Sequence, residues 1–162
     1  MFDKKYIKKL ENSPGWPDKS MLEKGAVAVL ECLEEIPCNP CETVCPKNSI
    51  TVGYPITNLP KFNNLCTGCG KCVVICPGLA IFLINRSYSK NEATVTIPYE
   101  FLPLPNIDER VSALDRAGNF ICEGTVLKVR SNKNYNKTVL VTIVVPKEYS
   151  DEVRFFSLRR DK

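Results

Sequence analysis

The sequence predicts an α+β fold: a β-α-β unit occurs twice over residues 21–85, and a small all-β domain follows over residues 86–162. Three observations lead to this prediction. The first half of the chain repeats itself, with Cys38 matching Cys69 at an offset of 31 residues. Each copy has a short apolar run on either side of a cysteine-rich loop. After residue 85, apolar and polar residues alternate or β-branched runs occur, as in strands.

Residues 1–20 are expected to form an N-terminal arm. A short helix there would carry one apolar stripe, surrounded by lysines, made of Phe2, Tyr6, Ile7 and Leu10. The stripe could dock on a partner or on the rest of the chain, or the terminus could fray. The segment "SPGWP" would end any helix.

The duplicated unit accounts for residues 21–85. Strands are expected within residues 25–32 and 49–53 of the first copy, and within residues 60–64 and 79–84 of the second. A cysteine loop and a short helical turn separate the strands of each pair. Such a unit made twice, with its helices on one face, is a ferredoxin-like arrangement.

The remaining residues are expected to form a small barrel or sandwich. Strand patterns occur in residues 92–101, 121–130 and 137–146, and "LPLPN" separates the first strand from the others. The basic residues of this part are expected to form a solvated face: Lys128, Arg130, Lys133, Lys137, Arg154, Arg159 and Arg160. Without regularly interleaved aromatic residues they do not indicate nucleic-acid binding.

The composition points to metal chemistry. The 162 residues include nine cysteines and no histidine, which excludes imidazole zinc sites and histidine-dependent catalysis. The N-terminus does not resemble a secretory signal, and no apolar run of about 18 residues predicts a membrane span. Cysteines in a cytoplasmic protein, the expected location, favour metal binding over disulfides. One of them, Cys122, lies on an expected strand far from the others and is expected to be a buried structural thiol.

The segment "CTGCGKCVVICP" is the strongest motif. Its spacing directs the sulfurs of Cys66, Cys69 and Cys72 to one point, while Cys76 lies one helical turn further on. In bacterial runs of this spacing, the three cysteines hold a [4Fe-4S] cluster and the fourth ligates a second cluster. Zinc is disfavoured, because it prefers two separated pairs of cysteines.

The first copy supplies Cys38, Cys41 and Cys45. Ligand exchange between the copies predicts two [4Fe-4S] clusters. The set that we call cluster 2 is complete: Cys45, Cys66, Cys69 and Cys72. The cluster 1 set contains Cys38, Cys41 and Cys76 and needs one more ligand.

Cys32 is the best candidate for the missing ligand. The position that matches Cys66 is Glu35, so the repeat lacks its first cysteine, and Cys32 lies within reach at the end of a strand. The alternatives are a three-iron cluster with a vacant corner, or Glu35 as an oxygen ligand. Cys32 would then be a buried structural residue.

Residues 25–85 resemble the two-cluster bacterial ferredoxins. More narrowly, "ECLEEIPCNPCETVCP" followed by "CTGCGKCVVICPGLAIF" resembles the iron–sulfur subunits of flavin-dependent amine or amino-acid dehydrogenases of the proline, hydroxyproline and sarcosine type. In that family the cysteine before the motif belongs to the same stretch as the cluster ligands. The resemblance therefore implies that Cys32 completes cluster 1.

The expected function is electron transfer, not catalysis. Clusters ligated by four cysteines transfer single electrons and leave no open site for a substrate. We expect an iron–sulfur subunit that connects a flavin-containing dehydrogenase with another carrier, such as a ferredoxin. The flavin would belong to the partner, because the chain has no GxGxxG fingerprint. The alternatives are a free-standing diffusible ferredoxin and a zinc-bound interaction module.

An acidic group accompanies the cluster 1 ligands: Glu31, Glu34, Glu35 and Glu42. Negative charge disfavours the reduced, more negative state of a cluster. We therefore expect cluster 1 to have the lower reduction potential.

Overall fold

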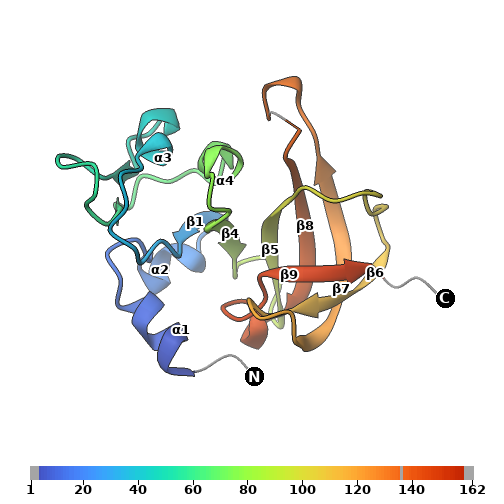
Figure 1. Cartoon of the computed structure of the whole chain (residues 1–162). Helices are drawn as coiled ribbons and strands as arrows, with labels where there is room; N and C mark the ends of the chain where they lie inside the picture. The colour runs from blue at the N-terminus through green and yellow to red at the C-terminus, as the bar shows by residue number, and fades with distance from the viewer. Residues whose placement is uncertain (1–3, 136, 159–162) are drawn as a thin grey trace.

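The computed structural model describes residues 4–135 and 137–158 (Figure 1). The helices are α1 (Lys4–Glu11), α2 (Lys19–Leu22), α3 (Pro40–Val44) and α4 (Lys71–Ile75), with 3-10 turns η1 (Lys133–Tyr135) and η2 (Lys147–Tyr149). The strands are β1 (Val27–Leu30), β2 (Ile50–Thr51), β3 (Lys61–Phe62), β4 (Ile81–Asn85), β5 (Glu92–Tyr99), β6 (Arg110–Leu114), β7 (Phe120–Arg130), β8 (Val139–Pro146) and β9 (Phe155–Leu158). Within the described ranges, no helix combines the length and the apolar character needed to cross a membrane.

The strands form two antiparallel sheets. The larger has seven strands in the order β1-β4-β5-β8-β7-β6-β9, and the smaller pairs β2 with β3. Strand β4 pairs with β1 on one side and with β5 on the other, so the sheet continues across the boundary expected at residue 85. Figure 1 shows the cysteine-bearing half on one side of this junction and the curved sheet of β5 to β9 on the other.

The β-branched runs form the centre of the large sheet. Strands β5 and β8 are paired over their whole length, from Glu92 opposite Pro146 to Tyr99 opposite Val139. Such residues fit the pleated, half-buried surface of a strand. Strands β6 and β9, which the sequence patterns did not indicate, extend the sheet. The ring of Phe156 in β9 stacks on Tyr99 with centroids 4.9 Å apart.

The two parts of the chain share a hydrophobic core. Leu140 of β8 is fully buried in one cluster with Leu30, Ile81 and Leu83 from the cysteine-bearing half. Tyr135, in the turn between β7 and β8, packs against the same cluster. The β-rich part is therefore packed directly against the segments that carry the cysteines.

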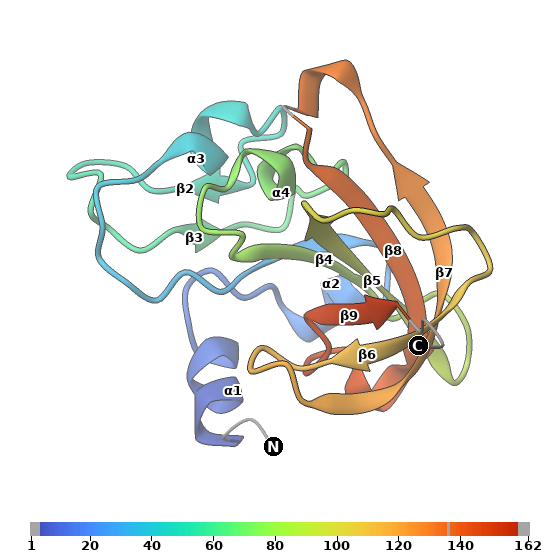
Figure 2. The ribbon, with the colours of Figure 1, turned by 45° about the vertical axis from the view of Figure 1, so that its right-hand side comes forward.

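The two cysteine segments have the same local conformation. Helices α3 and α4 end at Cys45 and Cys76, whose ψ angles are 110° and 113°. A proline follows each of these residues and restricts it to an extended conformation. Three residues after each cysteine, Asn48 and Leu79 both have φ of 50°. These residues, 31 positions apart, thus match in backbone conformation as well as in sequence. The two helices α3 and α4 lie side by side (Figures 1 and 2).

The N-terminal segment is packed on the rest of the chain. Leu10 of α1 is fully buried. After the helix, the carbonyl of Gly15 accepts a hydrogen bond from Leu30 N–H at 3.2 Å, and the carbonyl of Pro14 accepts one from Phe62 N–H at 2.8 Å. These contacts join the segment to β1 and β3. Phe2, the first residue of the expected stripe, lies outside the described residues.

Candidate metal centre

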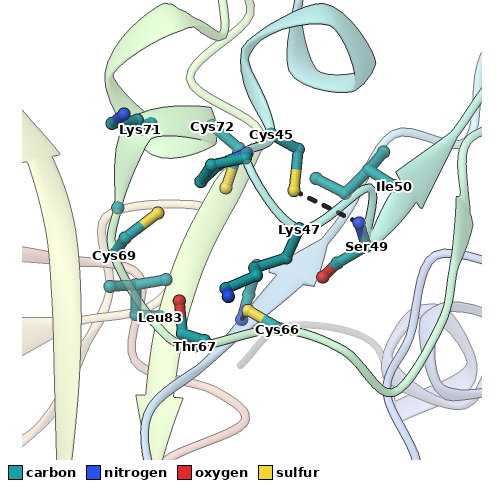
Figure 3. A pocket seen from close by; sticks show the side chains of 13 residues that line it. Cys45, Lys47, Ser49, Ile50, Cys66, Thr67, Cys69, Lys71, Cys72 and Leu83 are labelled. Carbon is teal, nitrogen blue, oxygen red and sulfur yellow. Dashed lines mark hydrogen bonds between the residues drawn. The ribbon is translucent and has the colours of Figure 1, made fainter.

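The four cysteines of the cluster 2 set line one cavity. Figure 3 shows the sulfurs of Cys45, Cys66, Cys69 and Cys72 around a common space, with Ser49 and Lys47 at its edge. The other wall residues are mostly apolar and include Ile50 and Leu83. Cys45 comes from the first copy and the other three from the second. The structure thus brings together the four residues that ligand exchange between the copies predicts.

Local geometry places each of these sulfurs. Cys45 ends α3, whereas Cys69 and Cys72 lie on either side of the start of α4. Between them, Gly70 has φ of 85° and forms the N-cap of α4, a left-handed conformation that glycine adopts without steric cost.

Backbone N–H groups are directed at the sulfurs. Cys66 Sγ accepts hydrogen bonds from Ala28 N–H and Gly68 N–H, both at 3.4 Å. Gly68 has φ of 66°, and a Cβ at this position would lie 2.3 Å from the carbonyl oxygen of Ala26. Gly68 therefore permits both the turn and the close approach of the cysteine loop to the segment leading into β1.

Cys45 is stabilised as a thiolate. Burial raises its pKa, but N–H groups, chiefly that of Ser49 at 3.2 Å from the sulfur, outweigh this effect and bring the pKa below its ordinary value. A thiolate is the form in which cysteine binds metals. The site thus favours the ligating form of this sulfur.

Cys72 shows how closely the sulfurs are grouped. Burial is the main cause that raises the pKa of its thiol far above the ordinary value, and the charges of Cys66, Cys69, Cys45 and Cys41 raise it further. Thiolates crowded in this way repel each other unless a positive metal centre offsets their charge. The donor set, the apolar wall and the N–H groups together fit a [4Fe-4S] cluster.

The cluster 1 set is also brought together. Burial, followed by the charges of Cys76 and Cys38, raises the pKa of Cys41 to about 11. The pKa of Cys32 is raised by burial and then by the charges of the same two residues. Cys76 Sγ accepts a hydrogen bond from Ala80 N–H at 3.4 Å. Cys32 therefore lies near enough to Cys76 and Cys38 for their charges to act on it, whereas Glu35, the alternative ligand, is exposed.

A single metal ion fits the described residues less well. Among residues 4–135 and 137–158, no three Cys, Asp or Glu side chains converge closely enough to hold one ion. A tetrahedral zinc ion would need its sulfurs about 2.3 Å away.

The β-rich part covers the loop of cluster 2. A Cβ at Gly70 would lie 2.8 Å from Leu140 Cδ1 and 3.2 Å from Arg130 Nη2. Arg130, at the end of β7, is half-buried, and Arg154 is buried with 3% of its surface exposed. The expectation of a solvated face is therefore wrong for Arg154, whereas Arg130 remains partly exposed. Arg159 and Arg160 lie outside the described residues.

Arg116 and Arg154 are the site residues that the sequence patterns missed. Both form ion pairs with Glu31, the residue before Cys32. They lie 85 and 123 positions away in the chain, and no motif connects such distant residues. The two arginines compensate the negative charge of Glu31. Glu31 therefore does not contribute to the acidic group that is expected to lower the reduction potential of cluster 1.

Cys122 lies away from both cysteine sets. It is buried in the core formed by strands β4 to β9, with 8% of its surface exposed. Burial, followed by nearby glutamates, raises the pKa of its thiol to about 11. A buried, protonated thiol of this kind is inert.

The comparison with protein families agrees with the cysteine geometry. Residues 60–82 match the family of 4Fe-4S binding domains. This segment contains Cys66, Cys69, Cys72 and Cys76. The chain thus carries a ferredoxin-type iron–sulfur domain for at least one [4Fe-4S] cluster, and this indicates an electron carrier rather than a catalytic enzyme. No curated protein and no solved structure matches the chain.

Proposed function

We propose that this chain is an electron-transfer subunit with two [4Fe-4S] clusters. It would relay single electrons between a flavin-containing dehydrogenase of the amine or amino-acid type and another redox carrier, such as a ferredoxin. Cluster 1 would be held by Cys32, Cys38, Cys41 and Cys76, and cluster 2 by Cys45, Cys66, Cys69 and Cys72.

The observation that carries the proposal is the exchange of ligands between the copies. Cys45 lies around one cavity with Cys66, Cys69 and Cys72 of the second copy. Cys76 lies near enough to Cys41 of the first copy for their charges to interact. Cys41 of one set is near enough to Cys72 of the other for their charges to interact. Two ligand sets so close together support a short path for electrons. A bound [4Fe-4S] cluster supplies one-electron redox chemistry.

The residues around the cysteines have supporting roles. The N–H groups of Ala28, Gly68, Ser49 and Ala80 are directed at sulfurs and stabilise negative charge there. Lys47 and Lys71 line the cavity of cluster 2 and place positive charge beside it. The apolar wall, together with the β-rich part that covers the loop, limits access of water.

Exposed apolar side chains beside cluster 1 support a protein partner. Tyr54 is 94% exposed, and Ile36 and Ile56 are 49% and 40% exposed. Cys38 N–H donates a hydrogen bond to the carbonyl of Ile56 at 3.2 Å, so these residues lie on loops next to a cluster 1 ligand. Apolar residues exposed together are typical of surfaces that bind another protein.

Anaerobic purification of the tagged chain from cells that produce it naturally tests the partner. We expect a flavoprotein in fixed ratio to the chain, detected by flavin absorbance and by gel filtration. The variant Tyr54→Ser should reduce its recovery about fivefold or more, as for an interface hot spot. Tyr88→Ser removes a tyrosine that is exposed on the loop between β4 and β5, and should leave the recovery unchanged.

The other outcomes separate the alternatives. A brown chain that elutes alone, without flavin, and exchanges electrons with several acceptors would identify a diffusible ferredoxin. A colourless chain containing zinc would identify an interaction module and contradict the iron–sulfur proposal.

A further inference from the structure

The carboxylate of Glu31 is the centre of a buried ionic network beside cluster 1. Only 9% of this residue is exposed. Arg154 Nε donates a hydrogen bond to Glu31 Oε1 at 2.6 Å, and Arg116 donates to both carboxylate oxygens. The arginines come from the β-rich part: Arg116 from the turn between β6 and β7, and Arg154 from the residues just before β9. The β-rich part thus binds directly to the residue that precedes Cys32.

The arginines are themselves fixed in place. The guanidinium of Arg154 lies over the ring of Phe82, 5.1 Å from its centroid, and donates to the carbonyl of Ser150 at 2.8 Å. Arg116 donates to the carbonyl of Asp151 at 3.2 Å and lies over the ring of Tyr6. With both partners fixed, the carboxylate of Glu31 has little freedom to move.

The backbone of Glu31 connects two cluster 1 ligands. Its N–H donates to the carbonyl of Ala80 at 2.8 Å, and the N–H of Ala80 donates to Cys76 Sγ at 3.4 Å. Cys32 follows Glu31 directly in the chain. Glu31 therefore lies where the segment carrying Cys32 meets the segment carrying Cys76.

Stability alone does not account for this network. Removing three charged groups from water is costly, and apolar residues of similar size often stabilise a core equally well or better. The best-attested use of such buried polar groups is to select one specific arrangement of the chain. Here the arrangement that is selected is that of the turn that enters the cluster 1 loop.

We propose that Glu31, held by Arg116 and Arg154, is the positioning residue for the Cys32 corner of cluster 1. This inference rests on the proposed function, in which Cys32 is the fourth ligand. The loop from Cys32 to Cys38 is longer than the two-residue spacing of the second copy, and its Cys32 end is fixed by the ionic network. Without the network, Cys32 moves away from Cys38, Cys41 and Cys76, and the site assembles with three irons instead of four.

The test compares iron per chain and electron paramagnetic resonance spectra of wild type and four variants, all purified without oxygen. Arg154→Met and Glu31→Gln weaken the network, and Arg154→Lys retains the positive charge. Lys147→Met is the control, because the side chain of Lys147 forms an ion pair with Glu23 and not with Glu31. Cluster 2 is the internal reference in every sample.

We expect Arg154→Met to lose about one iron of about eight per chain and to show a three-iron signal when oxidised, with cluster 2 unchanged. Glu31→Gln should show the same signal in a smaller fraction of molecules. Arg154→Lys should restore most of the wild-type spectrum, and Lys147→Met should match wild type. Two four-iron clusters in both Arg154→Met and Glu31→Gln would overturn the inference. Proportional loss of both clusters in those two variants would also overturn it, because the role would then be general stability.

The wild-type sample tests the proposed function separately. About four irons would remove the two-cluster assignment itself, and a three-iron signal before any substitution would remove Cys32 as the fourth ligand of cluster 1. About eight irons in wild type, with no selective change in the variants, would remove only the positioning role of Glu31.

Discussion

Replacement of Cys45 by alanine is expected to remove cluster 2 and to leave cluster 1, lowering the iron content from about eight to about four per chain. The expected effect is large because Cys45 is the ligand that the first copy supplies to the cavity formed by the second. The pKa of its thiol also lies below the ordinary value, because N–H groups, chiefly that of Ser49, outweigh the effect of burial. Iron and acid-labile sulfide analysis would measure the change.

Cys122→Ala is the control for this variant. It removes a buried cysteine from the sheet core and leaves both cysteine sets unchanged. Cys122→Ala should retain about eight irons per chain. Retention of all the iron by Cys45→Ala would show that Cys45 is not a ligand and would contradict the exchange of ligands between the copies.

Replacement of Gly68 by alanine is expected to destabilise the protein strongly and to impair assembly of cluster 2. A left-handed conformation costs a residue with a side chain about 1–3 kcal/mol. In addition, the new Cβ would lie 2.3 Å from the carbonyl oxygen of Ala26, which cannot move without displacing the segment leading into β1. The N–H groups of Gly68 and Ala28, which donate hydrogen bonds to Cys66 Sγ, would then move away from that sulfur.

Gly118→Ala separates the two causes. Gly118 has φ of 84°, and no atom lies within 4 Å of the position of a new Cβ, so only the backbone conformation is affected. Thermal unfolding followed by circular dichroism should show a larger fall for Gly68→Ala than for Gly118→Ala, and only Gly68→Ala should lose iron. Equal falls with full iron content would mean that the close approach to Ala26 has no role.

The sequence predicted the parts of the site that depend on local spacing. The cysteine intervals, with a proline after Cys45 and Cys76, are short enough to determine the turns that direct each sulfur. The repeat then paired Cys45 with the second copy, and the structure places it there. For the same reason β1, β2 and β3 lie within the expected ranges, and β4 extends only one residue beyond its expected end at residue 84.

The sequence did not predict what depends on distant pairing. Strand β9 carries a short aromatic pattern that becomes a strand only by pairing with β6. Arg154 resembled any surface arginine in the sequence, and its burial depends on Glu31 lying opposite it in the fold. The continuation of the large sheet across residue 85 also depends on pairing between distant segments, because β4 pairs with both β1 and β5.

Iron and acid-labile sulfide per chain, with electron paramagnetic resonance of the reduced protein, test the central claim most directly. The two ligand sets predict about eight irons, about eight sulfides and a spectrum of two clusters near enough to interact magnetically. About four irons with the spectrum of one isolated cluster would contradict the claim, and would restrict the iron–sulfur chemistry to a single site.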